Sequence, residues 1–241
     1  MLQAAELKKL VHKSTENLAG KFAREQHSEE EFLPMSAKQT KIQQQLDESI
    51  TILQNTIYEG LHSCILALER CQNPPLSKEV VTKELQKCLR PLKSEEHFAQ
   101  LGLCLFQETS WKQQLGISDR CMQSLYQGAR TLFEEKEYTQ AEKAFFMICS
   151  IDPTQPAYWI GLGHSSFQTQ NYQQAIRAYS MAGAMDPENI WPHIWAANCF
   201  EEEHEFEAAK LALHEALTLA LTLAKTSQNI DLIHTLEERV R

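Results

Sequence analysis

The chain has 241 residues, of which 43% are hydrophobic, so it can bury a sizeable core in one large domain or two smaller ones. It has only eight glycines and eight prolines against abundant Leu, Ala, Gln, Glu and Lys, which favours an all-helical protein over a sheet protein. The net charge of −9 argues against nucleic-acid binding, because a surface that contacts phosphates needs clustered Lys and Arg.

The cysteines and the apolar segments indicate where the protein works. Seven scattered cysteines with no C-x-x-C pair are typical of reduced thiols that pack as small hydrophobic side chains inside the cell. The first residues lack the apolar core of a secretory signal, and the most apolar run, 216–224, is too short to span a bilayer. We therefore expect a cytoplasmic protein without stable membrane insertion.

Residues 1–110 are predicted to form an N-terminal helical region. Residues 1–24 carry a broken helical pattern, and Pro34 interrupts whatever precedes it. Between 38 and 71, apolar residues recur every three or four positions, which predicts one long amphipathic helix. This stripe is buried either against other helices of the chain or between two chains in a coiled coil, and its short length favours the first. Its members are Leu46, Ile50, Leu53, Ile57, Leu61, Cys64 and Leu68.

Start and stop signals divide the rest of this region. Asn73-Pro74-Pro75 ends the long helix, and Ser77 can cap a further helix that Pro91 stops. Another helix is predicted over 94–108, where acidic residues precede an apolar pattern. Residues 111–117 are predicted to be a connector to the C-terminal half.

The C-terminal half contains an internal repeat of 34 residues. Aromatic residues recur at this interval (Tyr138, Tyr172 and Phe206), and so do alanines (Ala141, Ala175 and Ala209). This period is typical of tetratricopeptide (TPR) repeats, in which helix pairs stack into a superhelix with a peptide-binding groove. Within 118–225 we expect three repeats at about 122–155, 156–189 and 190–223, followed by a C-terminal capping helix at 226–241. The apolar face of this last helix, with Leu236, is expected to pack on the repeats, and its polar face, with Arg239, is expected to be solvated.

Most residues of the repeat fingerprint are predicted to be structural. Gly163 lets the two helices of the second repeat approach closely, and Pro187 ends the second of them. One repeated set is expected to fill the turns of the helix pairs (Tyr138, Tyr172 and Phe206). A second set is expected to carry packing to the next pair (Phe145, Tyr179 and Leu213).

Binding residues are expected on the first helix of each repeat, at positions that stacking leaves on the concave side. This set is mainly apolar and aromatic, which suits an extended peptide whose side chains enter pockets while polar groups meet its backbone. Alternatively, several members pack against the N-terminal helices or a second subunit. The predicted groove residues are Tyr126, Arg130 and Phe133 in the first repeat, Ile160, His164 and Phe167 in the second, and Trp191, Ile194 and Asn198 in the third.

Four segments resemble the class II chaperones of bacterial type III secretion, the LcrH/SycD family, over about residues 115–225. They are Leu125-Tyr126-Gln127-Gly128-Ala129 to Glu137-Tyr138, Gly161-Leu162-Gly163, Tyr179-Ser180-Met181-Ala182-Gly183-Ala184-Met185-Asp186, and Ala196-Ala197-Asn198-Cys199. The resemblance implies a cytoplasmic chaperone that keeps hydrophobic translocator proteins soluble and apart before export. It implies that the groove grips an extended translocator segment with a P-x-L-x-x-P-like motif, and that the chaperone forms a homodimer through its N-terminal region.

The resemblance also implies groove roles for particular residues. Tyr126 and Phe133 match aromatic groove positions of the family, and Ile160, Trp191 and Ile194 are carried over with them. The chain departs from the family in two respects. Residues 1–110 exceed its usual N-terminal segment, and His164 and Phe167 replace residues that are common in it, so the dimer geometry and the client stay open.

Enzyme classes fit this sequence poorly. The Gly161-Leu162-Gly163 segment lacks the third glycine of a dinucleotide-binding motif, and the sequence contains no P-loop, H-E-x-x-H or G-x-S-x-G motif. The acidic run 201–205 is typical of a solvated turn. We therefore predict no catalytic residue, metal or cofactor. Two other binding classes stay open: a scaffold or co-chaperone for another peptide, whose carboxylate clamp would need a basic cluster, and a structural subunit of an assembly.

Overall fold

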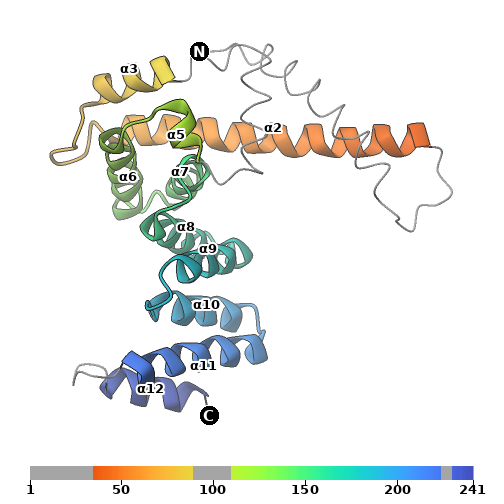
Figure 1. Ribbon diagram of the computed structural model, residues 1–241, viewed down its shortest axis with the longest axis vertical. Coiled ribbons are helices and arrows are strands. Elements are labelled where there is room, and N and C mark those ends of the chain that lie inside the picture. Colours follow the sequence, from red (N-terminus) through yellow and green to blue (C-terminus); the bar gives the residue numbers. More distant parts are fainter. Residues whose placement is uncertain (1–34, 89–109, 224–229, 241) are drawn as a thin grey trace.

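The computed structural model describes residues 35–88, 110–223 and 230–240 (Figure 1). These residues form helices and turns without any strand, which confirms the all-α prediction. The predicted helices at 1–24 and 94–108 lie outside the described residues. The helices are α2 (Met35–Ala67), α3 (Lys78–Cys88), α5 (Trp111–Leu115), α6 (Asp119–Glu134), α7 (Tyr138–Ile151), α8 (Pro156–Gln168), α9 (Tyr172–Met185), α10 (Trp191–Glu202), α11 (Phe206–Leu223) and α12 (Ile230–Val240).

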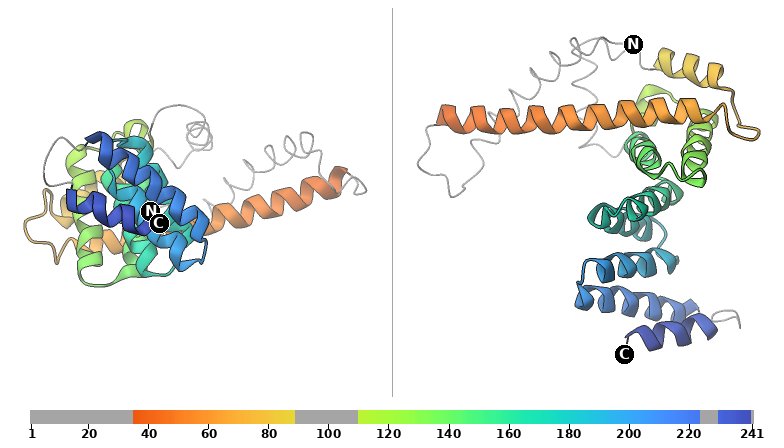
Figure 2. Two further views of the ribbon diagram at one scale, coloured as in Figure 1. Left: turned by 90° about the horizontal axis from the view of Figure 1, so that it is seen from below. Right: turned by 180° about the vertical axis from the view of Figure 1, so that it is seen from behind.

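Three antiparallel helix pairs stack in chain order, α6 with α7, α8 with α9, and α10 with α11. The long helix α2 crosses one end of this stack, and α12 packs on α11 at the other end (Figures 1 and 2). Helices α7 and α9 each end two residues before a proline, at Pro153 and Pro187, as predicted for Pro187. Helix α11 meets no proline and is longer. The repeat therefore sets helix length as well as helix position.

The turns inside the three pairs share one backbone conformation. Lys136, Gln170 and His204 have positive φ values of 64°, 62° and 61°, and they are spaced by the repeat interval. Each turn reverses the chain through a single left-handed residue, where a side chain is tolerated at a modest cost. The repeat thus extends to the backbone angles of its turns.

The predicted filling of these turns holds for two of the three pairs. Tyr138 packs edge-on against Phe133 with ring centroids 5.3 Å apart, and Tyr172 packs in the same way against Phe167 at 5.5 Å. In the third pair Phe206 is 58% exposed, so the prediction is wrong there. The residue one repeat after Phe167 is Glu201, which offers no ring to pack against.

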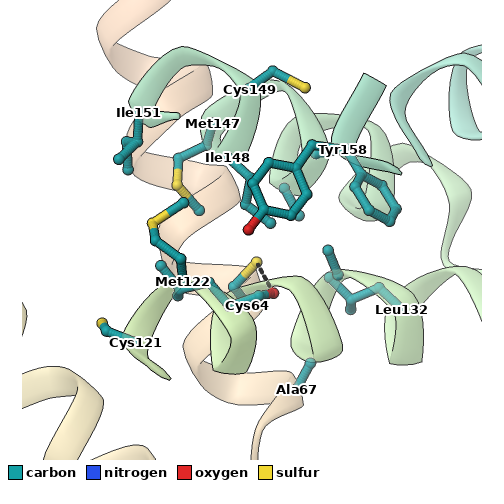
Figure 3. Close-up of a cluster of buried hydrophobic side chains, with 14 of the residues drawn as sticks. Cys64, Ala67, Cys121, Met122, Leu132, Met147, Ile148, Cys149, Ile151 and Tyr158 are labelled. Atoms are coloured by element: carbon teal, nitrogen blue, oxygen red, sulfur yellow. Dashed lines mark hydrogen bonds between the residues drawn. The ribbon is translucent and has the colours of Figure 1, made fainter. Parts of the chain in front are cut away.

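Helix α2 is built into the first repeat rather than merely preceding it. Cys64 is fully buried between α2 and α6, and its thiol donates to the Leu125 carbonyl oxygen at 3.5 Å (Figure 3). The same core contains Leu68, which directly follows α2, and Val81 and Leu85 from α3. Four stripe residues, Ile57, Leu61, Cys64 and Leu68, thus pack within their own chain. The side chains of the other three, Leu46, Ile50 and Leu53, lie outside the described part of the structure.

The predicted connector at 111–117 contains a short helix, α5. Ser110 caps its start by accepting a hydrogen bond from the Gln113 backbone N–H, and Gly116 ends it with a left-handed φ of 64°. Periodicity could not reveal a helix of five residues, although the serine and the glycine are ordinary cap signals. Helix α5 carries Lys112, whose ammonium group lies 2.9 Å from Asp152 and 2.7 Å from Asp119.

Asp152 is a carboxylate with almost no exposure, 1% for its side chain. Burial acts to raise its pKa, but hydrogen bonds from Thr154 and Lys112 outweigh this effect and hold the pKa below its usual value. Asp152 therefore stabilises the junction of α5 and α7 in its charged form. The stabilisation is complete above the pKa of the unfolded state and is lost as the pH falls through the lower folded-state pKa.

We expect Asp152→Asn to lower the free energy of unfolding by about 1.5 kcal/mol near neutral pH, because charge-assisted hydrogen bonds are lost. This difference from the wild type should narrow below about pH 4, where the wild-type carboxyl also becomes protonated. Urea denaturation of both proteins at neutral pH and below about pH 4 measures this difference. Asp119→Asn is the control: its side chain is 79% exposed, so its effect should stay below about 0.5 kcal/mol. Equal losses for the two variants would contradict the account.

The cysteines behave as small hydrophobic residues. All six cysteines in the described residues are free, and all except Cys71 are buried. Burial raises the pKa of Cys121 and of Cys199 to about 12, so both remain protonated thiols. Cys104 lies outside the described residues. In the parts of the chain that the structure describes, no helix combines the length and apolar character needed to cross a membrane.

Candidate peptide-binding groove

Aromatic rings form a continuous line over the first helices of all three repeats. The ring of Phe133 on α6 lies 6.4 Å from that of His164 on α8, centroid to centroid. The imidazole of His164 meets Trp195 on α10 edge-on at 4.5 Å, and Trp195 stacks on Trp191 at 6.0 Å. We call these four residues the aromatic row. The structure thus brings together three residues of the predicted groove, one from each repeat.

Trp195 links the row but was not among the predicted groove residues. The prediction relied on equivalence between repeats, and the positions one and two repeats before Trp195 are Gly161 and Gln127. Neither residue type signals an aromatic groove position. A search for large side chains within one turn of His164 in the neighbouring repeat would have been needed to find it.

Tyr126 lies at the other end of the first two repeats. Its ring packs against Tyr158 at 5.3 Å and against Phe145 at 6.0 Å, and its side chain is half-buried. Ile160, on α8, is also half-buried. Phe167 packs in the core of the second repeat beside Tyr172, so its ring contributes to the turn as well as to any groove.

Ile194 and Asn198 do not line an open groove, because both contact other parts of the chain. Ile194 is only 7% exposed, because its position on α10 faces α11. It belongs to the same core cluster as Leu213. Asn198 accepts a hydrogen bond from Arg239 on α12 at 2.9 Å. Arg239 also pairs with Glu201 at 2.7 Å. Ile194 is therefore not open to a ligand, and the polar end of α10 is covered by α12.

This contact corrects the role predicted for the polar face of α12. Arg239 was expected to be solvated, but its guanidinium ties α12 to α10. The opposite face packs as predicted, with Leu236 1% exposed against α11. Arg130, at the first-repeat position equivalent to Asn198, is exposed and pairs with Glu134 at 2.9 Å. The charged groups therefore lie at the two ends of the row and not within it.

His164 occupies the centre of the row and is its only titratable group. Its Nδ1 lies 2.8 Å from the hydroxyl oxygen of Tyr179, a residue that is 2% exposed. Gly163 makes this arrangement possible, because a Cβ there would overlap the Tyr179 ring. Desolvation lowers the pKa of His164 below its ordinary value. The row is therefore uncharged at neutral pH.

A second hollow lies over α9 and α11 and uses a different face of α10. Its volume is about 350 Å³, and its lining includes Tyr179 and Phe200, several small residues, and Leu211, which is 69% exposed. His193 at its edge lies 3.1 Å from Glu215. The hollow contains no residue of the aromatic row, so the two surfaces can be distinguished by substitution.

Comparison with known proteins supports the repeat assignment and the sequence resemblance. The tetratricopeptide repeat model matches residues 156–189, the second predicted repeat. Low calcium response locus protein H of Yersinia pestis is 28% identical over 103 residues, which are 43% of this chain and 61% of that protein. The protein of the same name from Yersinia pseudotuberculosis matches equally well. The chain thus spans less than two thirds of the length of these relatives.

Solved structures share the fold of the repeats. A chain of a type III secretion complex from Aeromonas hydrophila superposes with a TM-score of 0.52 and 20% identity, over 58% of this chain and 92% of that one. The type III secretion chaperone SycD of Yersinia enterocolitica, solved with a peptide of the translocator YopD, gives a TM-score of 0.46 with 25% identity, over 52% and 92% of the two chains. Over its repeats this chain is similar to the LcrH/SycD chaperones, which confirms the resemblance noted in its sequence.

Proposed function

We propose that this protein is a cytoplasmic chaperone that binds an extended segment of a hydrophobic translocator protein and keeps it soluble before type III secretion. The observation that carries the proposal is the aromatic row, which runs across the first helices of three consecutive repeats. The class of client comes from the resemblance to the LcrH/SycD chaperones. The protein acts by binding and not by catalysis.

The spacing of the row suits an extended polypeptide. Neighbouring ring centroids lie 6.4, 4.5 and 6.0 Å apart. Alternate side chains on one face of an extended chain lie about 6.6 Å apart. Successive apolar side chains of a client can therefore each contact an aromatic ring, which removes them from water and favours binding. Rings held by core packing lose little conformational entropy when the client binds.

The charges disfavour a carboxylate clamp of the co-chaperone type. Helices α8 and α10 contain no Lys or Arg. On α6, Arg130 is neutralised by Glu134, and at the far end Arg239 is neutralised by Glu201. A carboxylate clamp needs several unpaired cations that converge on one point. A client recognised by its apolar side chains fits this surface better.

Co-expression with a candidate translocator, a protein with long apolar segments, tests the proposal. We expect Trp195→Ala to weaken client binding at least tenfold, because large buried aromatic residues dominate such interfaces. Co-purification yield and titration calorimetry measure the loss, and circular dichroism checks that helicity is unchanged. Phe133→Ala should weaken binding in the same direction.

Leu211→Ala provides the matched control. Leu211 is a large exposed apolar residue on α11 that lies in the second hollow and outside the row. It should leave client affinity within about twofold of the wild type. If Leu211→Ala weakens binding and the row variants do not, the client occupies the second hollow instead. A translocator that stays soluble without this protein would contradict the chaperone function itself.

A further inference from the structure

We propose that the outer ring nitrogen of His164, Nε2, donates a hydrogen bond to a main-chain carbonyl oxygen of the client and so fixes the register of the client along the aromatic row. The identity of the ligand rests on the proposed function, whereas the identity of the donor follows from the structure alone. It follows from three features of His164: the tautomer, the accessibility of Nε2, and the uncharged surroundings.

The tautomer of His164 follows from the burial of Tyr179. The Tyr179 hydroxyl is enclosed, and its hydrogen-bond partner is Nδ1 of His164 at 2.8 Å. A buried hydroxyl hydrogen needs an acceptor, and Nδ1 is the acceptor within reach. If Nδ1 carried the imidazole proton, the hydroxyl hydrogen would be buried without a partner. Nδ1 therefore accepts, and the proton of the neutral ring lies on Nε2.

The Nε2 atom of His164 is not fully buried. Among the described residues, Oε1 of Gln127 is the only fully buried side-chain nitrogen or oxygen atom that has no hydrogen-bond partner. Nε2 of His164 has no hydrogen-bond partner there, and yet it is not such a buried atom. Nε2 therefore keeps some solvent-accessible surface, while the ring packs against Trp195 and Phe133.

Within the described residues, no ion pair or hydrogen bond joins a charged group to the His164 ring. The side chains that face it are Phe133 from α6, Tyr179 from α9 and Trp195 from α10, all of them uncharged aromatic residues. Protonation would place a positive charge in this apolar setting and would remove the acceptor of the Tyr179 hydroxyl. Desolvation accordingly lowers the pKa of His164, so the ring presents a neutral N–H donor at neutral pH.

A neutral donor inside an aromatic row selects a neutral acceptor. A carboxylate would lose its hydration there without gaining an opposite charge, whereas a main-chain carbonyl oxygen needs only one N–H. An extended client that lays apolar side chains on Phe133 and Trp195 brings its intervening backbone over His164. One carbonyl oxygen can then be paired instead of being buried unsatisfied, which should be worth about tenfold in affinity.

Nitrogen-15 NMR of the histidine-labelled full chain tests the donor without any client. His164→Gln identifies the resonances of His164. We expect the pattern of a ring protonated at Nε2 near pH 7.5, and we expect the His164 ring to remain mostly neutral at about pH 6.5, where an ordinary histidine is half charged. Tyr179→Phe should allow both tautomers, because Nδ1 loses its hydroxyl partner. A ring protonated at Nδ1, or a charged ring at neutral pH, would overturn the inference.

A backbone substitution in the client tests the acceptor. The probe is an acetylated and amidated peptide of the translocator segment that the complex protects from proteolysis, prepared as a series with one amide at a time replaced by an ester. An ester carbonyl oxygen is a weaker acceptor. We expect one ester position to weaken binding to the wild type about tenfold and to have no such effect on a chain that lacks the imidazole.

The chain used for this comparison carries both His164→Phe and Tyr179→Phe, since loss of the imidazole alone would leave a buried hydroxyl unsatisfied. Tyr179→Phe alone is its control, because Nε2 can still carry a proton there. If every ester lowers affinity equally in the wild type and in the double variant, His164 does not bind the client backbone. If no translocator peptide binds the wild type, the proposed function fails, whereas the NMR experiment still decides the donor.

Discussion

Replacing Gly60 by alanine should lower the free energy of unfolding by about 3 kcal/mol, although alanine normally favours a helix over glycine. Gly60 lies where α2 crosses α7. A Cβ at this position would overlap the carbonyl oxygen of Lys143 and lie 2.6 Å from its carbonyl carbon. Both atoms belong to the backbone and cannot rotate away, so the two helices would have to separate. Chemical denaturation of the full chain measures the loss.

Gly183→Ala is the matched control, because it makes the same change in the last turn of another helix, α9. A Cβ at Gly183 would meet its first neighbour, Nε2 of His193, at 3.5 Å, which is an ordinary contact. We expect Gly183→Ala to be neutral or to stabilise the protein by up to about 1 kcal/mol. Gly128→Ala should behave like Gly60→Ala, since its Cβ would lie 2.7 Å from the Cys64 carbonyl oxygen. Similar effects at Gly60 and Gly183 would show that α2 does not dock as described.

Removal of residues 1–109 should cost more than about 5 kcal/mol of stability, which is comparable with the total stability of many domains. The deletion takes Leu68, Val81 and Leu85 out of the core, and each buried aliphatic side chain of this kind contributes roughly 1.5–3 kcal/mol. It also exposes Met122 and Leu125 of α6, which are at most 1% exposed in the complete chain. The remaining repeats should unfold without cooperativity or associate through the uncovered face.

A shorter deletion separates this core contribution from the rest of α2. Removing residues 1–54 spares Ile57 and all later residues of the core, and it takes away the part of α2 that projects beyond the repeats (Figure 2). We expect its unfolding free energy to stay within about 1 kcal/mol of the wild type. Sedimentation and thermal unfolding compare the two deletions. A chain starting at residue 110 that is monomeric and unfolds cooperatively would contradict the packing of α2 and α3.

Much of the fold could be predicted because the repeats are stacked copies of one unit. Each copy meets the same neighbours, so the same residue type recurs every 34 positions, as Ala141 and Ala175 do at contacts with no exposed surface. The start of α3 followed from Ser77 and the end of α9 from Pro187, because both signals act locally. Three residues of the aromatic row, Phe133, His164 and Trp191, were found by the same equivalence. Their role in binding stays a prediction.

Departures from repeat equivalence were not predictable in this way. Trp195 has glycine and glutamine at its equivalent positions, yet it joins the row by reaching across to His164. Ile194 was placed in the groove, but the contact between α10 and α11 buries it. Arg239 was placed in solvent, but it pairs with Glu201 on another helix. Each case depends on the separation between α10 and a neighbouring helix, which the repeat pattern does not specify.

The sequence by itself therefore determined the helical class, the repeat period, the turns and the small residues at helix contacts, because these depend on local propensity and on a pattern that every copy shares. The tertiary structure alone decided that α2 completes the first repeat, which rings form one row, and which nitrogen of His164 faces outward. These features arise where residues far apart in the chain meet once, so no periodic signal records them.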